Sequence, residues 1–390
     1  MTKLNKNIIF LGMVSFFTDL SSEIIFPILP LFLEHFLKAS KFEIGLIEGS
    51  AQLTASVLKV ISGYISDKIG RRKPVVVLGY AISTVVKPLL FLSVNWKDVF
   101  VLRILERAGK GIRTPPRDAL LSQYVNKDFS GRAFGFHRGM DTAGAVFGSL
   151  IVMMFFYFFG VSEETFRNIF LFSFLPGFIA LIILVIFVKE KKSQYLSNSN
   201  HTSFCQSVKK LPGKFYVLLT VQILFTILSI NFAFVILKVN SSGISMFFIP
   251  VVYLLFNFVY AVMSYPIGLI SDKIGKGTTL SLTYFSFGIS SFILSGNIPW
   301  VGILGFVLYG IFMAGNEVVS RAIVSDVVPL KLKGTAYGIY HTATGIAVFI
   351  SSSLTGIIWD FFGSFVPFFV SSIGTLIIAI FSYLKLKKLF

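Results

Sequence analysis

Long apolar stretches recur along the whole of this 390-residue chain. A helix needs roughly 20 mostly apolar residues to cross the hydrocarbon of a bilayer. Because no water is available there, the segment must satisfy its own backbone hydrogen bonds, which favours helices. Two groups of six stretches meet this length: 8–32, 44–65, 74–94, 99–123, 134–159 and 168–188, then 215–237, 245–270, 278–296, 300–324, 336–361 and 364–384. The sequence therefore predicts an all-α integral membrane protein with 12 transmembrane helices in two six-helix bundles.

The composition excludes several other classes of protein. Hydrophobic residues make up 55% of the chain and charged residues only 14%, whereas soluble domains carry about 25% charged residues. A water-soluble enzyme, a nucleic-acid-binding domain and a disordered tail are all disfavoured on this ground. The single cysteine, Cys205, allows no internal disulfide and no thiolate metal cluster.

Basic residues exceed acidic ones, 35 against 18, and the excess follows the loops. With the N-terminus inside, the inner loops hold most of the Lys and Arg residues, and the outer side holds Lys38, Lys41, Lys97, Arg167 and Lys238. Cytoplasmic loops of membrane proteins carry such an excess. We therefore predict a multi-pass protein of the cell (cytoplasmic) membrane with both termini in the cytoplasm. The net charge of +17 then requires no nucleic-acid partner.

A polar, Ser/Asn-rich segment separates the two groups of stretches. We interpret 189–214 as a cytoplasmic linker, with an N-terminal six-helix bundle at 1–188 and a C-terminal six-helix bundle at 215–390. The first apolar run is not interpreted as a cleaved signal peptide, because Asp19, Glu23 and two prolines interrupt it.

The two halves repeat one another. Ile-Ser-Asp-Lys-Ile-Gly occurs at 65–70 and again at 270–275, 205 positions later. Gly-Arg-Ala-Phe-Gly at 131–135 is similar to Gly-Thr-Ala-Tyr-Gly at 334–338, an offset of 203. Two internal sequence matches at nearly the same offset indicate that a six-helix unit is repeated in the chain in the same orientation.

These residues resemble the loop signature of the major facilitator superfamily of secondary transporters, in particular its multidrug-efflux-like members. The signature reads Gly-x-x-x-Asp-Arg/Lys-x-Gly-Arg/Lys-Arg/Lys between the second and third helices. The residues that fill it are Gly63, Asp67, Lys68, Gly70, Arg71 and Arg72. The second copy, with Asp272 and Gly275, is degenerate after Lys276. The resemblance covers the whole chain and implies the family's fold, two bundles related by an internal pseudo-two-fold repeat.

The resemblance also implies a cytoplasmic gate. In the family this loop is thought to latch the two halves together on the cytoplasmic side, with Asp67 near a positive helix N-terminus. Arg71 or Arg72 would then pair with an acid at the inner end of the fourth helix, for which we select Asp118. The alternative is that the loop charges only solvate and orient the loop, which we prefer for Lys73.

Ionisable residues interrupt the first and fourth stretches. Each costs roughly 2.5–3.5 kcal/mol at the bilayer centre, and such groups usually mark a pathway. Asp19 and Glu23 are four residues apart and therefore share one face of a helix. The fourth stretch carries a charged stripe within an arc of roughly 140°: Arg103, Glu106, Arg107, Lys110, Arg113 and Arg117.

Counted from the cytoplasmic ends, Lys110 and Arg113 lie at about the depth of Asp19 and Glu23. We therefore predict a proton-coupling or substrate cavity in which Asp19 or Glu23 binds a proton or a cation. Its switching partner would be Arg107, Lys110 or Arg113, because a nearby cation opposes protonation of a desolvated carboxylate. The other interpretation is a static ion-pair network, which we prefer for Arg103.

The second half carries fewer charges within its stretches. Glu317 and Arg321 are four residues apart and fit an internal salt bridge as well as a binding pair. The seventh stretch supplies the neutral polar residues Gln222, Thr226 and Asn231. We therefore expect the first half to couple transport and the second half to shape the substrate site.

The fifth stretch combines a histidine with spaced glycines. Family members that exchange drugs for protons carry a glycine-rich motif with a Gly-Pro step here. Gly135, Gly144 and Gly148 match its spacing, but Ser149 stands where proline would be, which weakens the case for drug/proton antiport. For His137, near the inner end, we expect a solvated or hydrogen-bonded side chain.

Enzymatic and ATP-driven motifs are lacking in the sequence. It contains no Gly-x-x-x-x-Gly-Lys-Ser/Thr segment, no His-Glu-x-x-His and no nucleophile elbow in a strand-turn-helix setting. We therefore expect a monomeric transporter of a small molecule in the lipid bilayer, not an enzyme, without cofactor or metal site and driven by the proton gradient.

The preferred function is alternating-access, proton-coupled efflux of organic compounds. The alternatives are a uniporter or importer of an organic solute and a metal-ion exporter on the same fold, with the ion at Asp19 and Glu23. A non-transporting receptor on this scaffold is a third class.

Overall fold

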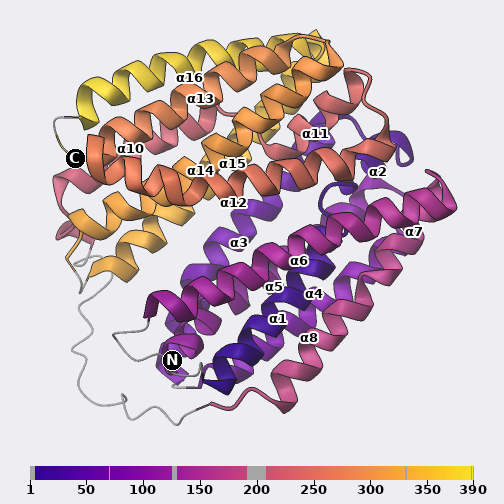
Figure 1. Ribbon diagram of the computed structural model, residues 1–390, viewed down its shortest axis with the longest axis horizontal. Helices are drawn as coiled ribbons and strands as arrows, with labels where there is room; N and C mark the ends of the chain where they lie inside the picture. Colours follow the sequence, from indigo (N-terminus) through magenta and orange to yellow (C-terminus); the bar gives the residue numbers. More distant parts are fainter. Residues whose placement is uncertain are drawn as a thin grey trace. The chain divides into compact units, whose positions relative to one another are not determined.

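The computed structural model describes residues 5–69, 71–124, 130–190, 208–329, 332–387 and 389, without the side chains of residues 67 and 130–134. All twelve predicted stretches are helical in it (Figure 1). The first half contains α1 (Lys6–Glu23), α2 (Leu29–His35), α3 (Lys41–Ile69), α4 (Lys73–Leu89), η1 (Leu90–Leu92), α5 (Trp96–Ser122), α6 (Ser130–Phe159), α7 (Glu163–Phe172) and α8 (Phe174–Ile186). The second half contains α10 (Gly213–Leu228), α11 (Phe232–Ser241), η3 (Met246–Phe248), α12 (Ile249–Ile274), α13 (Lys276–Ser295), α14 (Pro299–Val327), α15 (Lys333–Phe362) and α16 (Phe365–Leu386).

Within the described residues, nine helical segments are long and apolar enough to cross a membrane. The three remaining stretches fall on α1 with α2, on α5 and on α13. The 18 residues of α1 include Lys6, Asp19 and Glu23, α5 carries the charged stripe, and α13 is rich in Ser and Thr. Polar side chains, and not a lack of helix, therefore distinguish these three stretches.

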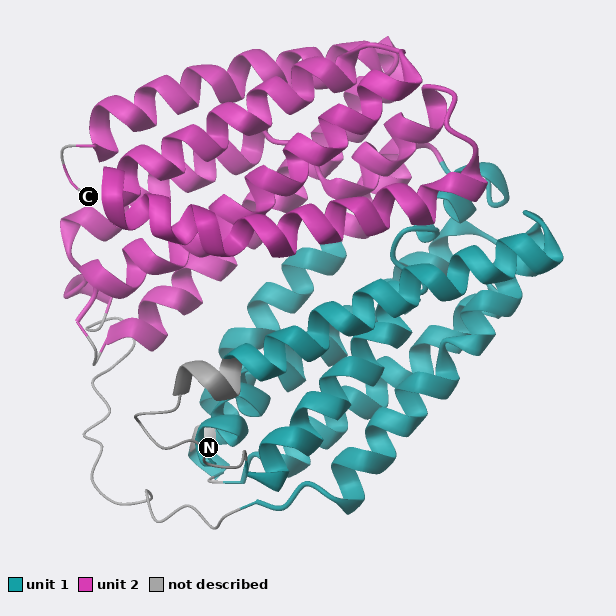
Figure 2. Ribbon diagram, viewed as in Figure 1, with its two compact units in different colours: residues 1–39, 50–199 teal, residues 40–49, 200–390 magenta. Residues whose placement is uncertain are grey.

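The chain forms two compact units (Figure 2). Unit 1 comprises 1–39 and 50–199, and unit 2 comprises 40–49 and 200–390. The bundle boundaries at 188 and 215 stay a prediction, and residues 191–207 of the predicted linker lie outside the described residues.

The N-terminal part of α3, residues 41–49, belongs to unit 2, which the sequence did not indicate. The Asp360 carboxylate, near the end of α15, accepts hydrogen bonds from the backbone N–H groups of Lys41 (2.9 Å) and Phe42 (2.8 Å). A carboxylate at a helix N-terminus satisfies free N–H groups and complements the helix dipole. Next to this cap, Gly45 lies directly against the Ser352 carbonyl, where a Cβ would clash.

The first helix of each half is interrupted at a corresponding place. Residues 24–28, which include Pro27, separate α1 from α2. Residues 229–231, about 205 positions later, separate α10 from α11, and Ser229 there has an extended backbone. Proline disrupts the first helix because it lacks an N–H donor, whereas the Asn231 side chain caps the new helix by accepting from Ala233 N.

Prolines do not interrupt the charged helix. α5 runs continuously through Pro115 and Pro116. At its outer end, Asn95 and Asp98 form a capping box. Hydrogen bonds from the backbone N–H groups of Val94 and Asn95 lower the pKa of the Asp98 carboxyl.

Lys238 is buried, although its position at the outer end of α11 suggested a solvated loop charge. Its side chain is 0% exposed. The ammonium donates to Asn297 Oδ1 (2.6 Å) and to Ser364 Oγ (2.9 Å). Both acceptors are neutral, so this lysine joins the outer ends of three segments of unit 2 without an acidic partner among the described residues.

Glycines bring α6 against α1 beside the charged residues of α1. A Cβ on Gly144 would clash with the Phe16 carbonyl and lie 3.3 Å from the Asp19 Cβ. A Cβ on Gly148 would lie 3.1 Å from the Glu23 Cβ. In the same way Gly79 and Gly109 let α4 and α5 approach closely, since a Cβ on Gly109 would be 2.7 Å from the Gly79 carbonyl oxygen. Unit 1 therefore holds α1, α4, α5 and α6 at short range around the ionisable residues.

This packing predicts an effect of Gly144→Ala on stability. The added methyl group has to push α6 away from the α1 backbone, and overpacking of this kind costs about 1–3 kcal/mol. We expect a lower Tm of the purified protein in detergent, measured by intrinsic fluorescence. Gly139→Ala on the same helix is the control, because a Cβ there meets nothing within 4 Å. An unchanged Tm for Gly144→Ala would contradict the close approach of the two helices.

Candidate functional site

Glu106 is the centre of a buried ion-pair cluster on α5. Its Oε2 atom lies 2.9 Å from Arg103 Nη1 and 3.4 Å from Arg107 Nε. The side chain of Glu106 is only 7% exposed, and both guanidinium groups lie 5.7 Å from the centroid of the Phe26 ring, in the break between α1 and α2. Two neighbouring cations, one of them hydrogen-bonded, compensate the burial of this carboxylate.

Asp19 lies among the other charged residues of unit 1. Its side chain is partly exposed. The charged groups that act on its carboxylate come from α4, α5 and α6: Lys87, Lys110, Arg113, Arg117 and Asp141. Lys110 and Arg113, two of the bases that the sequence selected as its partners, therefore lie within electrostatic range of Asp19.

Glu23, the second predicted carboxylate, is half-buried at the end of α1. Its Cβ faces Gly148 of α6. Arg107, the third predicted switching partner, pairs with Glu106, and Arg113 is 98% buried with its guanidinium 4.5 Å from the centroid of the Tyr80 ring. One nitrogen of Arg113, Nη1, has no hydrogen-bond partner among the described residues.

His137 and Asp141 extend the cluster along α6. Ser15 donates a hydrogen bond to Asp141, and His137 Nδ1 lies 3.7 Å from the same carboxylate oxygen. We expected a solvated or hydrogen-bonded histidine at the inner end of the helix. The side chain is only 6% exposed and its Nδ1 atom faces Asp141, so of these two alternatives the structure excludes the solvated one.

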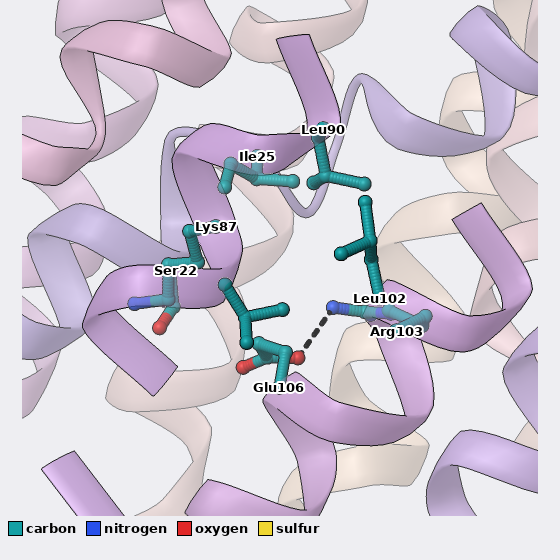
Figure 3. A pocket seen from close by; sticks show the side chains of 8 residues that line it. Ser22, Ile25, Lys87, Leu90, Leu102, Arg103 and Glu106 are labelled. Carbon is teal, nitrogen blue, oxygen red and sulfur yellow. Dashed lines mark hydrogen bonds and ion pairs between the residues drawn. The ribbon is translucent and has the colours of Figure 1, made fainter. Parts of the chain in front are cut away.

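Lys87 on α4 is a residue that the sequence analysis missed. It is 2% exposed, and its ammonium donates to Ser21 Oγ at 3.0 Å. Figure 3 shows that Lys87, Arg103 and Glu106 line one cavity together with Ser22, Ile25 and Leu90. A lysine inside the apolar run 74–94 was the signal that could have identified it.

The charged pair of unit 2 is an internal salt bridge. Arg321 Nη2 lies 2.7 Å from Glu317 Oε1 on the same helix, and Tyr260 donates a hydrogen bond to Glu317. Arg321 is 57% exposed, so solvent weakens this pair. Of the two interpretations that the sequence left open, the geometry agrees with the salt bridge.

The predicted gate residues are only partly described. Gly63 packs near Pro115, Arg71 and Lys68 are exposed, and Asp272 is exposed before Gly275, whose φ of 91° suits glycine. Gly70 and the side chain of Asp67 lie outside the described residues.

The pairing of Asp118 with a loop arginine stays a prediction. Asp118 pairs with Arg117 at 2.8 Å, and Arg72 donates to the Ala119 carbonyl oxygen at 2.9 Å. Arg72 still contacts the inner end of α5, through a backbone oxygen.

No group of three or more His, Cys, Asp or Glu side chains that could hold a metal ion occurs in the described part of the chain. This is a finding about those residues alone.

Comparison with known proteins identifies the family. The model of the Major Facilitator Superfamily matches residues 11–252 and 215–388. An uncharacterized MFS-type transporter of Methanocaldococcus jannaschii is 37% identical over 367 residues, which are 92% of this chain and 89% of that protein.

The chain belongs to the major facilitator superfamily. Its members are membrane transporters of small molecules and not enzymes, so this chain is a multi-pass MFS transporter with the predicted twelve-helix fold. The multi-drug resistance efflux pump PmrA of Streptococcus pneumoniae is 30% identical over 182 residues, 45% of this chain and 43% of the pump.

Solved MFS structures share the fold at low sequence identity. The nucleoside transporter NupG has a TM-score of 0.80 with 12% identity, and the match covers 98% of this chain and 100% of that one. A D-xylose-proton symporter has a TM-score of 0.75 with 14% identity, and the match covers 97% of each chain.

The burial of the Glu106 cluster predicts a large effect of Glu106→Gln. Removing the charge takes this carboxylate away from two buried guanidinium groups, and breaking a buried pair costs about 3–5 kcal/mol. We expect a clear loss of Tm in detergent. Glu317→Gln is the matched control, because its half-solvated pair is worth about 1 kcal/mol or less. Equal losses for the two variants would contradict the difference in burial.

Proposed function

We propose that this MFS transporter is a proton-coupled exporter of small organic compounds, and that Asp19 is the carboxylate that takes up and releases the proton. The single observation that carries this proposal is the position of Asp19. It is a partly exposed acid on α1, within the electrostatic range of the bases Lys110 and Arg113 of α5 and of Asp141 of α6.

Two opposing influences act on this carboxylate. The neighbouring Asp141 disfavours a second negative charge, and the bases Lys110 and Arg113 favour it. The proton affinity of Asp19 therefore depends on the distance between α1 and α5. A movement that separates the two helices favours protonation, and their approach expels the proton, which is the alternation that coupling needs.

The break after Glu23 supplies a place for such a movement. Residues 24–28 separate α1 from α2, so α1 can change its angle without bending a continuous helix. Glu23 lies at this end of α1 and is the second candidate for the proton site. We assign Arg103 and Arg107 to the static pairing of Glu106, and Glu317 with Arg321 to a static salt bridge.

Export is supported by the similarity to a multi-drug efflux pump over less than half of the chain. Gly144 and Gly148 also match the spacing of the glycines in the motif of drug/proton antiporters, although Ser149 stands where that motif has proline. A uniporter or importer of an organic solute is the second candidate, since the nucleoside transporter and the D-xylose-proton symporter share the fold.

The remaining parts of the proposal come from the sequence. The loop charges support cytoplasmic termini in the cell membrane. We further propose a monomer that uses the proton gradient and no cofactor.

Asp19→Asn tests the proposal. Host cells that lack their own major efflux pumps are grown with dyes, antibiotics and metal salts while they express the wild type or a variant. We expect the wild type to raise tolerance to an organic compound several-fold and Asp19→Asn to remove that gain, because the amide cannot ionise. Glu164→Gln, which neutralises an exposed acid in the first turn of α7, should behave as the wild type.

The compound identified in this way is then followed in proteoliposomes. Wild-type flux should depend on a proton gradient, and the Asp19→Asn flux should not respond to it. Wild-type flux that is unchanged after nigericin collapses the gradient would contradict coupling and favour a uniporter. Tolerance gained only for metal salts would favour the metal exporter.

A further inference from the structure

The outer end of α3 belongs to unit 2, although the rest of this helix belongs to unit 1. α3 is one continuous helix over Lys41–Ile69. Its residues 41–49 pack within unit 2, and its residues 50–69 pack within unit 1 (Figure 2). A movement of one unit against the other therefore has to bend α3 or detach one of its two ends. The contacts of residues 41–49 show how the outer end is held.

A carboxylate of α15 caps the outer end of α3. Asp360 accepts hydrogen bonds from the backbone N–H groups of Lys41 (2.9 Å) and Phe42 (2.8 Å). The N–H group of Glu43 has an acceptor nearby in sequence, Ser40 Oγ, at 3.2 Å. Asp360 thus binds the first two of the N–H groups that a helix leaves free. Its negative charge also complements the positive end of the helix dipole.

Glycines let α3 and α15 meet backbone to backbone below this cap. A Cβ on Gly45 would lie 2.2 Å from the carbonyl oxygen of Ser352, and one on Gly49 would lie 2.9 Å from the Cα atom of Phe349. From the other helix, a Cβ on Gly356 would lie 2.4 Å from a carbonyl oxygen of α3. Because glycine has no side chain, none has to be repacked at these three positions when the helices part.

The cap itself is accessible to water. Asp360 is exposed, so water can replace the carboxylate at the two N–H groups and can solvate the freed carboxylate. Lys41 adds a cation–π contact to the same end, with its ammonium 5.3 Å from the centroid of the Trp359 ring. The outer end of α3 therefore combines a tight backbone contact with a charged cap that solvent can open.

We propose that Asp360 is an outer latch of this transporter. By capping α3 it holds the outer ends of α3 and α15 together, and its release lets these ends part so that the outer side opens. The inference goes beyond the proposed function, because an exporter, an importer and a uniporter would all need such a contact to open. It does not depend on proton coupling.

A cysteine on the face of α15 that meets α3 reports on the latch. Ser353 shares this face with Phe349, Gly356 and Asp360, because their spacings are three or four residues. Its buried hydroxyl has no hydrogen-bond partner among the described residues, so Ser353→Cys removes no such bond. Cys205→Ser first removes the single native thiol. A membrane-impermeant maleimide, applied to intact cells, then measures the exposure of the introduced thiol to the outside.

We expect Asp360→Ala to raise the labelling rate several-fold, because the N–H groups of α3 lose their acceptor and the helix dipole loses its complementary charge. Asp360→Asn keeps an acceptor oxygen without the charge and should give an intermediate rate. Asp98→Ala is the matched control. Asp98 is another outer carboxylate that accepts from backbone N–H groups, just before α5 in unit 1, and its loss should leave the rate unchanged.

The outcomes distinguish the latch from a general loosening and from the proposed function. Equal labelling rates with and without the Asp360 carboxylate would overturn the latch. An equal rise in Asp98→Ala would also overturn it, because any lost cap would then have the same effect. If Asp360→Ala does not reach the membrane, Asp360→Asn decides by the same criterion. A flux without dependence on the proton gradient would contradict the proposed function, whereas a raised labelling rate in Asp360→Ala would still support the latch.

Discussion

Charge compensation inside unit 1 is the constraint on which the rest of the structure depends. Ionised side chains in a membrane are tolerated when opposite charges lie within reach. Glu106 meets this condition with Arg103 and Arg107 at 2.9 and 3.4 Å. The apolar helices around it could not bury these groups singly, so their pairing along α5 allows this charged face of the helix to lie inside unit 1.

Small residues make that meeting possible. Gly144 and Gly148 bring α6 to α1 beside Asp19 and Glu23, and Gly79 with Gly109 brings α4 to α5. The closeness of the helices shortens the distances between charges and thereby strengthens their interaction. Packing and electrostatics therefore act together. The glycines let the helices pack closely beside Asp19, and in the proposed mechanism the nearby charges control the protonation of this residue.

Much of the fold could be predicted from the sequence, because length, hydropathy and an internal repeat are properties of the chain itself. Helical spacing and depth also indicated Lys110 and Arg113 as bases near Asp19, and both act electrostatically on its carboxylate. The hydrogen-bond and ion-pair partners of individual side chains could not be predicted from the sequence. Asp118 pairs with its neighbour Arg117, Lys238 is buried between Asn297 and Ser364, and His137 faces inward. Each of these depends on how a helix is rotated within its unit, which a pattern of apolar residues fixes only coarsely. Lys87 escaped notice for the same reason.

The central claim is that one carboxylate of α1 exchanges a proton as it meets the bases of α5. The most direct measurement is proton release by the purified protein in weakly buffered detergent solution when the exported compound binds, followed with a pH-sensitive dye. The account predicts release of about one proton per bound compound, with a dependence on pH that follows the protonation of Asp19. Binding without proton release at any pH would contradict it.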